Sequence, residues 1–248
     1  MHPTLRRLAH RPYPPPGDRP WIMAQTWYDL CFMHWRVAPK DLRPLIPAAL
    51  EIDLWRSDAY VAVVPFGMKG VRLRGTPNLP WLSRFLELNV RTYVKHRGRP
   101  GVFFFSLDAA NPVAVRVARA AYHLPYYDAR MKKSPAPNEG FHYESERTHR
   151  GAPAAILRVA YRPTAPVAHA APGSLEAFLT ERYRLLTVDR RGRPYSGEIH
   201  HEPWPLQLAE ADIDTNTMTA PHGLRLEGAP LVHFAASIDT IEWAIRPE

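Results

Sequence analysis

The segment from Leu86 to Met131 places the strongest constraint on what this chain can fold into. It opens with a strand-like run in which polar and apolar side chains alternate, passes through a glycine-containing turn, and reaches the apolar run 102–105. Successive side chains of a strand project to opposite faces of a sheet. The first run therefore has one polar and one apolar face, whereas the second is apolar on both. Because the two runs would pair as a hairpin, the sequence predicts a sheet that is covered on both sides.

The polar face of the first run carries a carboxylate, an amide, a guanidinium and a phenol. These side chains are Glu87, Asn89, Arg91 and Tyr93. At about 3.3 Å per residue, Glu87 and Arg91 lie about 13 Å apart along the strand, so they cannot pair with each other. On an open face all four would meet water, but on a covered face they must be satisfied in a polar pocket. We predict such a pocket, with Glu87 as a candidate catalytic residue and Asn89, Arg91 and Tyr93 as ligand-binding residues.

A helix and an aromatic turn follow the two strands. Asn111 is a typical N-cap, Pro112 suits the first helical position, and Pro125 ends the helix. This unit brings four polar side chains beside the sheet: Arg119, His123, Tyr126 and Tyr127. We predict that the arginine and the histidine contact a ligand and that the two tyrosines are candidate catalytic residues. The alternative is that the tyrosines fill the core with their hydroxyl groups at the surface.

The remaining chain consists of short strand-like runs separated by turn signals. Strands are expected at 25–36, 50–55, 59–66, 71–74, 141–147, 155–161, 187–189, 195–201, 204–211, 232–237 and 240–245, with hairpins joining 50–55 to 59–66 and 187–189 to 195–201. One short helix or two turns fit 38–47, and a clearer helix covers 175–183 with Ser174 as its N-cap. Roughly ten strands without strand–helix–strand alternation predict a mainly β (α+β) fold, an antiparallel barrel or sandwich with a few short helices. We expect an extended proline-rich arm at 1–20 and a single domain at 21–248.

Composition argues against several classes of protein. The single cysteine, Cys31, rules out an internal disulfide framework. No apolar run approaches the roughly 20 residues of a membrane helix, and the N-terminus has no secretory hydrophobic segment, so we expect a cytoplasmic protein without membrane attachment. A net charge of +8 raises the question of nucleic acid, but the arginines are dispersed and no recognition motif accompanies them. We expect a small-molecule ligand and no nucleic acid, and leave open whether the chain forms homo-oligomers.

No cofactor or metal is expected. The metal-capable residues 198–202 include the adjacent His200 and His201, which face opposite ways on a strand and lack a spaced partner. The chain also contains no phosphate-binding glycine loop and no dinucleotide fingerprint.

The same segments resemble the uncharacterised YqjF-like family of the acetoacetate-decarboxylase-like superfamily. The matching residues are Trp35 with 39–47, 59–61 with 64–66, 87–94, 101–107 and 124–127. The resemblance implies a closed or nearly closed β-barrel with a few helices and an internal pocket. It also equates Glu87 with the active-site glutamate of the decarboxylases.

The resemblance implies a Schiff-base lysine whose pKa is lowered by an adjacent lysine, and it places this pair at Tyr126 and Tyr127 of this chain. The expected nucleophile is therefore missing. Lys132 and Lys133 lie six residues beyond that position, and on an extended strand they point to opposite faces. We expect both to be surface lysines.

Two functions stay open at this point. The first is an enzyme with lyase- or hydrolase-type chemistry on a small carboxylate or keto acid, in which Arg91 or Arg119 holds the carboxylate and Glu87 acts with the tyrosines. The second is a non-catalytic barrel protein that binds a small apolar or acidic ligand. Both require Glu87 and Arg91 to face the interior.

Overall fold

A computed structural model describes residues 3–77, 83–122 and 124–248. The described strands are β1 (Met23–Val37), β2 (Glu51–Ile52), β3 (Ala59–Leu73), β4 (Phe85–His96), β5 (Arg99–Ala109), β6 (Tyr126–Ala136), β7 (Gly140–Arg147), β8 (Ile156–Pro163), β9 (Arg184–Val188), β10 (Pro194–His200), β11 (Gln207–Asn216), β12 (Leu231–Glu242) and β13 (Arg246–Pro247). The described helices are α1 (Pro39–Leu42), α2 (Pro112–Tyr122) and α3 (Leu175–Thr180), with 3-10 turns η1 (Pro3–Arg6), η2 (Arg43–Leu45) and η3 (Ala220–His222).

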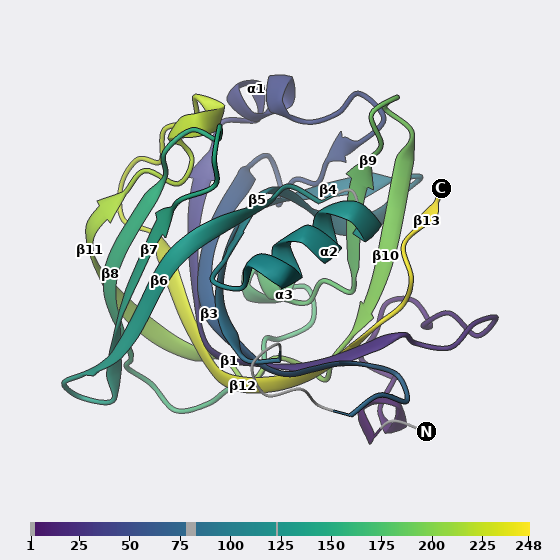
Figure 1. Ribbon diagram of the computed structural model, residues 1–248, viewed down its shortest axis with the longest axis horizontal. Helices are drawn as coiled ribbons and strands as arrows, with labels where there is room; N and C mark the ends of the chain where they lie inside the picture. The colour runs from purple at the N-terminus through teal and green to yellow at the C-terminus, as the bar shows by residue number, and fades with distance from the viewer. Residues whose placement is uncertain (1–2, 78–82, 123) are drawn as a thin grey trace.

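The strands form one continuous sheet that closes on itself twice (Figure 1). Strands β12, β1, β3, β4 and β5 make a wall that belongs to both closures. On one side, β6, β7, β8 and β11 complete what we call the first circuit; on the other, β9 and β10 complete the second circuit. The mainly β barrel expected from the sequence is therefore confirmed, in a form that gives each face of the wall an interior of its own.

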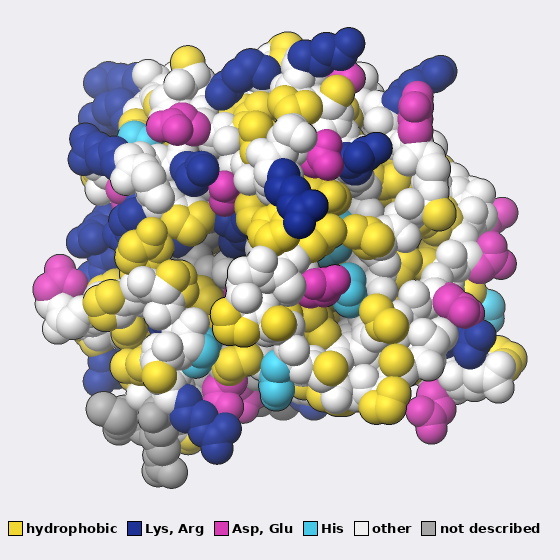
Figure 2. Space-filling view, turned by 180° about the vertical axis from the view of Figure 1, so that it is seen from behind, with side chains coloured by type: hydrophobic (Ala, Val, Ile, Leu, Met, Phe, Trp, Pro, Cys, Tyr) yellow, Lys and Arg dark blue, Asp and Glu magenta, His cyan; other side chains and the backbone are white. Residues whose placement is uncertain are grey.

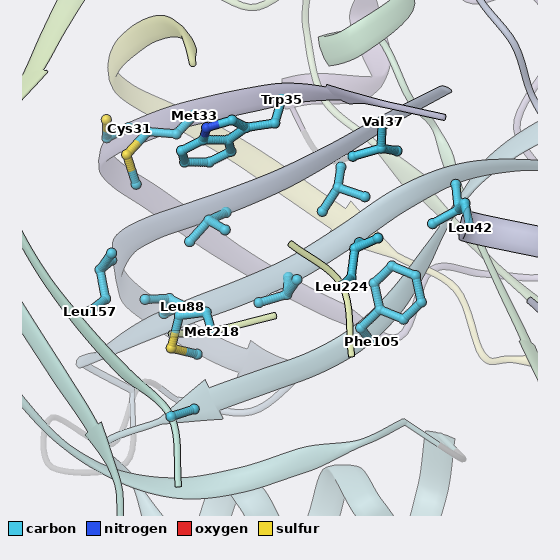
Figure 3. Close-up of a cluster of buried hydrophobic side chains, with 14 of the residues drawn as sticks. Cys31, Met33, Trp35, Val37, Leu42, Leu88, Phe105, Leu157, Met218 and Leu224 are labelled. Atoms are coloured by element: carbon cyan, nitrogen blue, oxygen red, sulfur yellow. The ribbon is translucent and has the colours of Figure 1, made fainter. Parts of the chain in front are cut away.

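The wall is covered on both faces, as the apolar run 102–105 beside the alternating strand predicted. Residues 87–94 of β4 are all buried. The face toward the first circuit is apolar: Met33, Trp35, Leu88 and Phe105 pack with Leu157 of β8 in one buried cluster (Figure 3). The opposite face carries the alternate side chains of β4 and looks into the second circuit, where α3 packs against it.

Local signals placed the two helix caps of this region correctly, whereas the turn expected at 98–101 lies one residue earlier, because β5 already begins at Arg99. The β4–β5 hairpin turns at Arg97 and Gly98, both in the left-handed region with φ of 50° and 72°. Asn111 caps α2, because its Oδ1 accepts hydrogen bonds from the amides of Val113 and Ala114 at 3.0 and 3.1 Å. Ser174 caps α3 by accepting from the amide of Ala177 at 3.2 Å. That helix ends at Thr180, earlier than expected, because β9 begins at Arg184.

The aromatic turn expected after Pro125 is instead the start of a long strand. β6 runs parallel to β5, pairing Leu107 with Tyr126 and Asp108 with Tyr127. The segment β5–α2–β6 is thus a strand–helix–strand unit, contrary to the expectation that the chain contains none. Its helix was visible in the sequence, but the polar side chains of 126–136 conceal the strand, because pairing with β5 and β7 rather than β-propensity holds it.

Further expectations about the pairing and the boundaries of strands were wrong. The hairpin between 50–55 and 59–66 does not form: β2 pairs with Lys95 and Val94 of β4, and only a bridge joins Trp55 to Asp58. The separate strands expected at 71–74 and 59–66 are one strand, β3, and those expected at 232–237 and 240–245 are likewise one strand, β12. Glycines and polar residues that read as breaks are tolerated inside these long strands.

The N-terminal segment lies against β10. The Arg11 guanidinium donates to the Glu198 carboxylate at 3.1 Å, and the His200 ring bonds the carbonyl oxygen of Thr4 at 2.8 Å. In the part of the chain that the structure describes, no helix has the length and apolar character needed to cross a membrane. On the face shown in Figure 2, Lys and Arg side chains gather along the left edge and the top, and basic, acidic and apolar side chains are interspersed over the rest.

Closure of the second circuit depends on a glycine. A Cβ on Gly101 would lie 2.9 Å from the carbonyl oxygen of Arg184 and 3.2 Å from the Leu186 side chain. Val102, the next residue, pairs with Leu185, and this pair joins β5 to β9.

We therefore expect Gly101→Ala to lower the free energy of unfolding by about 1–3 kcal/mol, because the two backbones must move apart. Urea unfolding measures this, with Gly17→Ala as the control because no atom lies within 4 Å of the position that a Cβ would take there. Equal midpoints for the two variants would contradict the close approach of β5 and β9.

Candidate functional site

The polar side chains of β4 lie on the face of the wall that looks into the second circuit. Glu87 and Arg91 are 3% and 8% exposed, and Asn89 is buried between them. Across the β3–β4 pairing, Glu87 lies opposite Phe66, Asn89 opposite Val64, and Arg91 opposite Ala62. The interior placement that both functional hypotheses required is therefore present.

Glu87 and Tyr126 form a hydrogen-bonded pair at one end of this face. The Tyr126 hydroxyl donates to the Glu87 carboxyl, whose Oε2 has no hydrogen-bond partner among the described residues. Burial raises the pKa of Glu87 to about 8; the bond from Tyr126 opposes the rise, and the neighbouring carboxyls of Glu242 and Asp108 add to it. Glu87 therefore carries a proton at neutral pH. Burial, followed by the charge of Glu87, holds the pKa of Tyr126 well above its ordinary value.

A second carboxyl, that of Glu242, lies near this pair and was missed in the sequence. It sits on β12, accepts a hydrogen bond from the Gln25 amide, and has its pKa raised to about 7 by burial. Burial and then Glu242 also raise the pKa of Tyr122 to about 12. The local signal for Glu242 was a single acidic residue inside the apolar run 241–243. Its hydrogen-bond partner, Gln25 on β1, cannot be found from a local pattern.

Tyr127 points to the other face of β6. It is paired with Asp108, and the Arg147 guanidinium carbon lies 4.1 Å above its ring while the same arginine donates to Asp108 at 3.0 Å. Arg119 is exposed and donates to the carbonyl oxygen of Tyr126 at 2.6 Å. The structure thus brings Tyr126, but neither Tyr127 nor Arg119, to the Glu87 carboxyl. His123 lies outside the described residues.

At the other end of the polar face, Arg91 lies among aromatic rings. Its guanidinium carbon is 5.4 Å from the centre of the Phe32 ring and 6.0 Å from that of Tyr93. The guanidinium hydrogen-bonds the Tyr93 side chain, and its Nη2 makes a long 3.5 Å contact with the carbonyl oxygen of Leu179. Tyr93 is buried and donates to the same carbonyl at 2.8 Å. No acidic side chain of the described chain forms an ion pair with Arg91.

Two histidines that the sequence did not place at this site complete this end. His34 on β1 and His233 on β12 have ring centres 6.5 Å apart and are 1% and 6% exposed. Four polar atoms of this end have no hydrogen-bond partner among the described residues: His34 Nδ1, Asn89 Oδ1, Arg91 Nε and His233 Nδ1. Buried polar atoms are nearly always satisfied, so such a cluster calls for water or a ligand.

The lysines lie elsewhere. Lys132 is exposed, and Lys133 forms an ion pair with Asp29 and lies 4.4 Å from the centre of the Tyr28 ring. None of the five lysines of the chain, all of them in its described part, bonds to Glu87 or Tyr126. Cys31 is buried in the apolar cluster of the first circuit, where desolvation raises the pKa of its thiol.

Two surface hollows are separate from this polar face. A cleft of about 550 Å³ is bordered by Trp35, Ile213, 216–217, 219–220 and 224–228. A water-sized hollow of about 20 Å³ lies beside Arg11 and Glu198. Neither is lined by Glu87, Asn89 or Arg91. The residues that the structure describes contain no group of three or more metal-capable side chains close enough to hold an ion.

The arrangement of strands is that of acetoacetate-decarboxylase-like proteins. Acetoacetate decarboxylase itself superposes with a TM-score of 0.63 at 12% identity, covering 93% of this chain and 90% of that one. The enduracididine biosynthesis enzyme MppR, solved in complex with pyruvate, gives 0.62 at 11% identity over 93% and 91% of the two chains. An acetoacetate-decarboxylase-like enzyme from Sphingomonas wittichii RW1 gives 0.60 at 13% identity over 93% and 94%.

Sequence comparison narrows the class to a family. Residues 24–239 match DUF2071, described as an uncharacterized conserved protein. The chain is 44% identical over 230 residues to the uncharacterized protein YqjF of Bacillus subtilis (strain 168), covering 92% of this chain and 93% of that protein. The chain belongs to the DUF2071 family, and the resemblance to YqjF-like proteins and to the acetoacetate-decarboxylase-like fold is confirmed.

The raised pKa of Glu87 has a direct consequence for stability. Below the ordinary glutamate pKa of 4.5 the carboxyl is protonated in both folded and unfolded chains, so burial carries no ionisation cost. As the pH rises from 4.5 to about 8, the unfolded chain loses this proton while the folded chain keeps it. Stability is lost over that window.

Glu87→Gln removes the ionisable group and should be more stable than the parent by on the order of 3 kcal/mol at pH 8, with the difference shrinking toward pH 4.5. Urea unfolding at a series of pH values measures it. The exposed Glu144→Gln on β7 is the matched control. A pH-independent difference between Glu87→Gln and the parent would contradict a protonated Glu87.

Proposed function

We propose that the polar face of the wall binds a small carboxylic acid inside the second circuit. In this proposal Arg91 pairs with the ligand carboxylate, Asn89 and Tyr93 line the site, and Glu87 with Tyr126 exchanges a proton with an oxygen of the ligand. The reaction class that fits is acid–base chemistry on a carboxylate or keto acid that forms no covalent bond to the protein.

The buried, unpaired guanidinium of Arg91 carries the proposal. An arginine keeps its charge in essentially every protein setting, and a buried charge without a counter-ion is costly. The described chain supplies no carboxylate to Arg91, although it supplies one to the buried arginines Arg147 and Arg182. A ligand carboxylate would complete the site with charge-assisted hydrogen bonds.

The proton on Glu87 supports the second part of the proposal. A carboxyl with a pKa of about 8 can give or take a proton near neutral pH, which is the condition for general acid–base catalysis. Tyr126 bonds one carboxyl oxygen and leaves the other without a partner, so the group is held in place with one oxygen available.

The solved structures of the same fold include one with a ligand of this class. One of them is MppR complexed with pyruvate, a small keto acid. Likeness at 11% identity concerns the fold, so the ligand class rests here on Arg91 and its surroundings.

A non-catalytic binding protein is the second candidate, and the missing lysine favours it. The residue that contacts Glu87 is Tyr126, which cannot form an imine with a keto acid, and a ligand held by Arg91 could simply stay bound. Nuclear magnetic resonance of the ligand after incubation separates the two functions, since an enzyme changes the ligand or exchanges its carbon-bound protons and a binder does neither.

Small carboxylic acids at millimolar concentration should raise the melting temperature of the protein by a few degrees, because binding to the folded state alone stabilises it. Pyruvate, acetoacetate, lactate and 3-hydroxybutyrate form the panel. Arg91→Gln should abolish the shift, and the exposed Arg158→Gln should keep it. An unchanged shift in Arg91→Gln, or no shift from any acid in the parent, would contradict the site.

Keto acids should form no reducible adduct with this chain. Incubation with acetoacetate or pyruvate followed by borohydride should leave the intact mass unchanged, because no lysine reaches the Glu87 pair. A covalent mass increase that disappears in Lys132→Arg or Lys133→Arg would overturn the imine-free chemistry.

A further inference from the structure

One row of residues crosses the wall from β1 to β4 through β3. His34 pairs with Ala62, and Ala62 pairs with Arg91. At about 4.8 Å between strands, the Cα atoms at the two ends of the row lie about 10 Å apart. The side chains converge on the carbonyl oxygen of Leu179: Arg91 Nη2 lies 3.5 Å from it, and the Tyr93 hydroxyl, which bonds the His34 ring, lies 2.8 Å from it. The two polar groups are therefore within reach of one small organic acid. Phe32 lies beside both ends, 6.1 Å from the His34 ring and 5.4 Å from the Arg91 guanidinium.

The hydrogen bonds at the first end of this row fix the tautomer of His34. Tyr93 has one hydroxyl hydrogen, and it is donated to the carbonyl oxygen of Leu179 at 2.8 Å. The His34 Nε2 lies 2.7 Å from the same hydroxyl oxygen, so this nitrogen must be the donor of that bond. In a neutral imidazole only one nitrogen carries hydrogen, and Nδ1 is therefore a bare acceptor.

His34 is neutral. Burial, followed by the positive charge of Arg91 and then by His233, holds the pKa of His34 well below its ordinary value. Its Nδ1 is buried and receives no hydrogen bond from the described residues. The row thus offers a cation at one end and a hydrogen-bond acceptor without a donor at the other.

We infer that the ligand of this site is a hydroxy acid, whose carboxylate binds Arg91 and whose hydroxyl donates to His34 Nδ1, with Tyr93 as the residue that positions the imidazole. The inference rests on the proposed function and narrows its ligand class. A keto acid of the same length presents a carbonyl oxygen to Nδ1, so two acceptors meet and both stay unsatisfied.

The cost of that mismatch sets the expected selectivity. Leaving a buried acceptor unpaired costs about 1–3 kcal/mol, which corresponds to about 5- to 150-fold in affinity. We expect 3-hydroxybutyrate to bind at least about 10-fold more tightly than acetoacetate, or lactate more tightly than pyruvate, whichever pair has the length of the site.

Isothermal titration of these two matched pairs with the full chain tests the inference. Tyr93→Phe removes the hydroxyl that fixes the tautomer, so His34 can carry its hydrogen on Nδ1, and the preference for the hydroxy acid should fall to about 3-fold or less. His34→Phe should lose the preference while still binding both acids through Arg91. Nitrogen-15 chemical shifts of the histidine rings provide a readout that does not depend on a ligand, with His34 Nδ1 unprotonated in the parent chain.

The outcomes separate this inference from the proposed function. A hydroxy-acid preference that Tyr93→Phe and His34→Phe both remove supports it. Equal or keto-preferring affinities in the parent, with Arg91→Gln still abolishing binding, overturn the hydroxy-acid inference and leave the carboxylate site standing. A protonated His34 Nδ1 in the parent also overturns it. No binding of any acid overturns both.

Discussion

Burial of β4 on both faces is the constraint on which the rest of the structure depends. A strand at the middle of a wall shared by two closed circuits has no route to water for either set of its side chains. The apolar set packs into the first circuit. The polar set must find partners in the second circuit, and the chain provides them only in part: Tyr126 for Glu87, and the Tyr93 side chain with one long backbone contact for Arg91. This incomplete satisfaction distinguishes a site from a polar core.

The two ends of the polar face are built for different tasks. At the Glu87 end the surroundings disfavour ionisation, since burial and the carboxyl of Glu242 both raise the pKa of Glu87. The Arg91 end holds a fixed positive charge over aromatic rings beside a neutral imidazole. A molecule held between them would meet a proton donor at one end and an anion-binding group at the other. The resemblance to the decarboxylases equates Glu87 with their glutamate and puts Tyr126 at the position of their lysine; in the structure these two residues contact each other.

Much of the fold followed from local chemistry in the sequence. Alternation in 87–94 and the apolar run at 102–105 showed a doubly covered hairpin, and the caps at Asn111 and Ser174 were readable because one side-chain oxygen decides them. The pairing of the strands was harder to predict from the sequence. That Tyr126 and Tyr127 face opposite ways depends on β6 pairing with β5, and no local pattern states which strand lies beside another.

The candidate site shows the same division. Glu87, Asn89, Arg91 and Tyr93 share one strand, so a period of two was enough to group them. His34, His233 and Glu242 come from other strands of the wall and join the group only through register. Single histidines in apolar runs are ordinary core residues. His34 differs because the bond from Tyr93 to the Leu179 carbonyl fixes its tautomer, and this bond is visible only in the folded structure.

A high-resolution crystal structure of the protein grown with 3-hydroxybutyrate would show whether the unsatisfied polar atoms of the wall belong to a ligand site. We expect density for the acid inside the second circuit, with its carboxylate on Arg91 Nε. An Arg91 surrounded by ordered water alone, with the acid absent or bound in the cleft beside Trp35, would contradict this expectation.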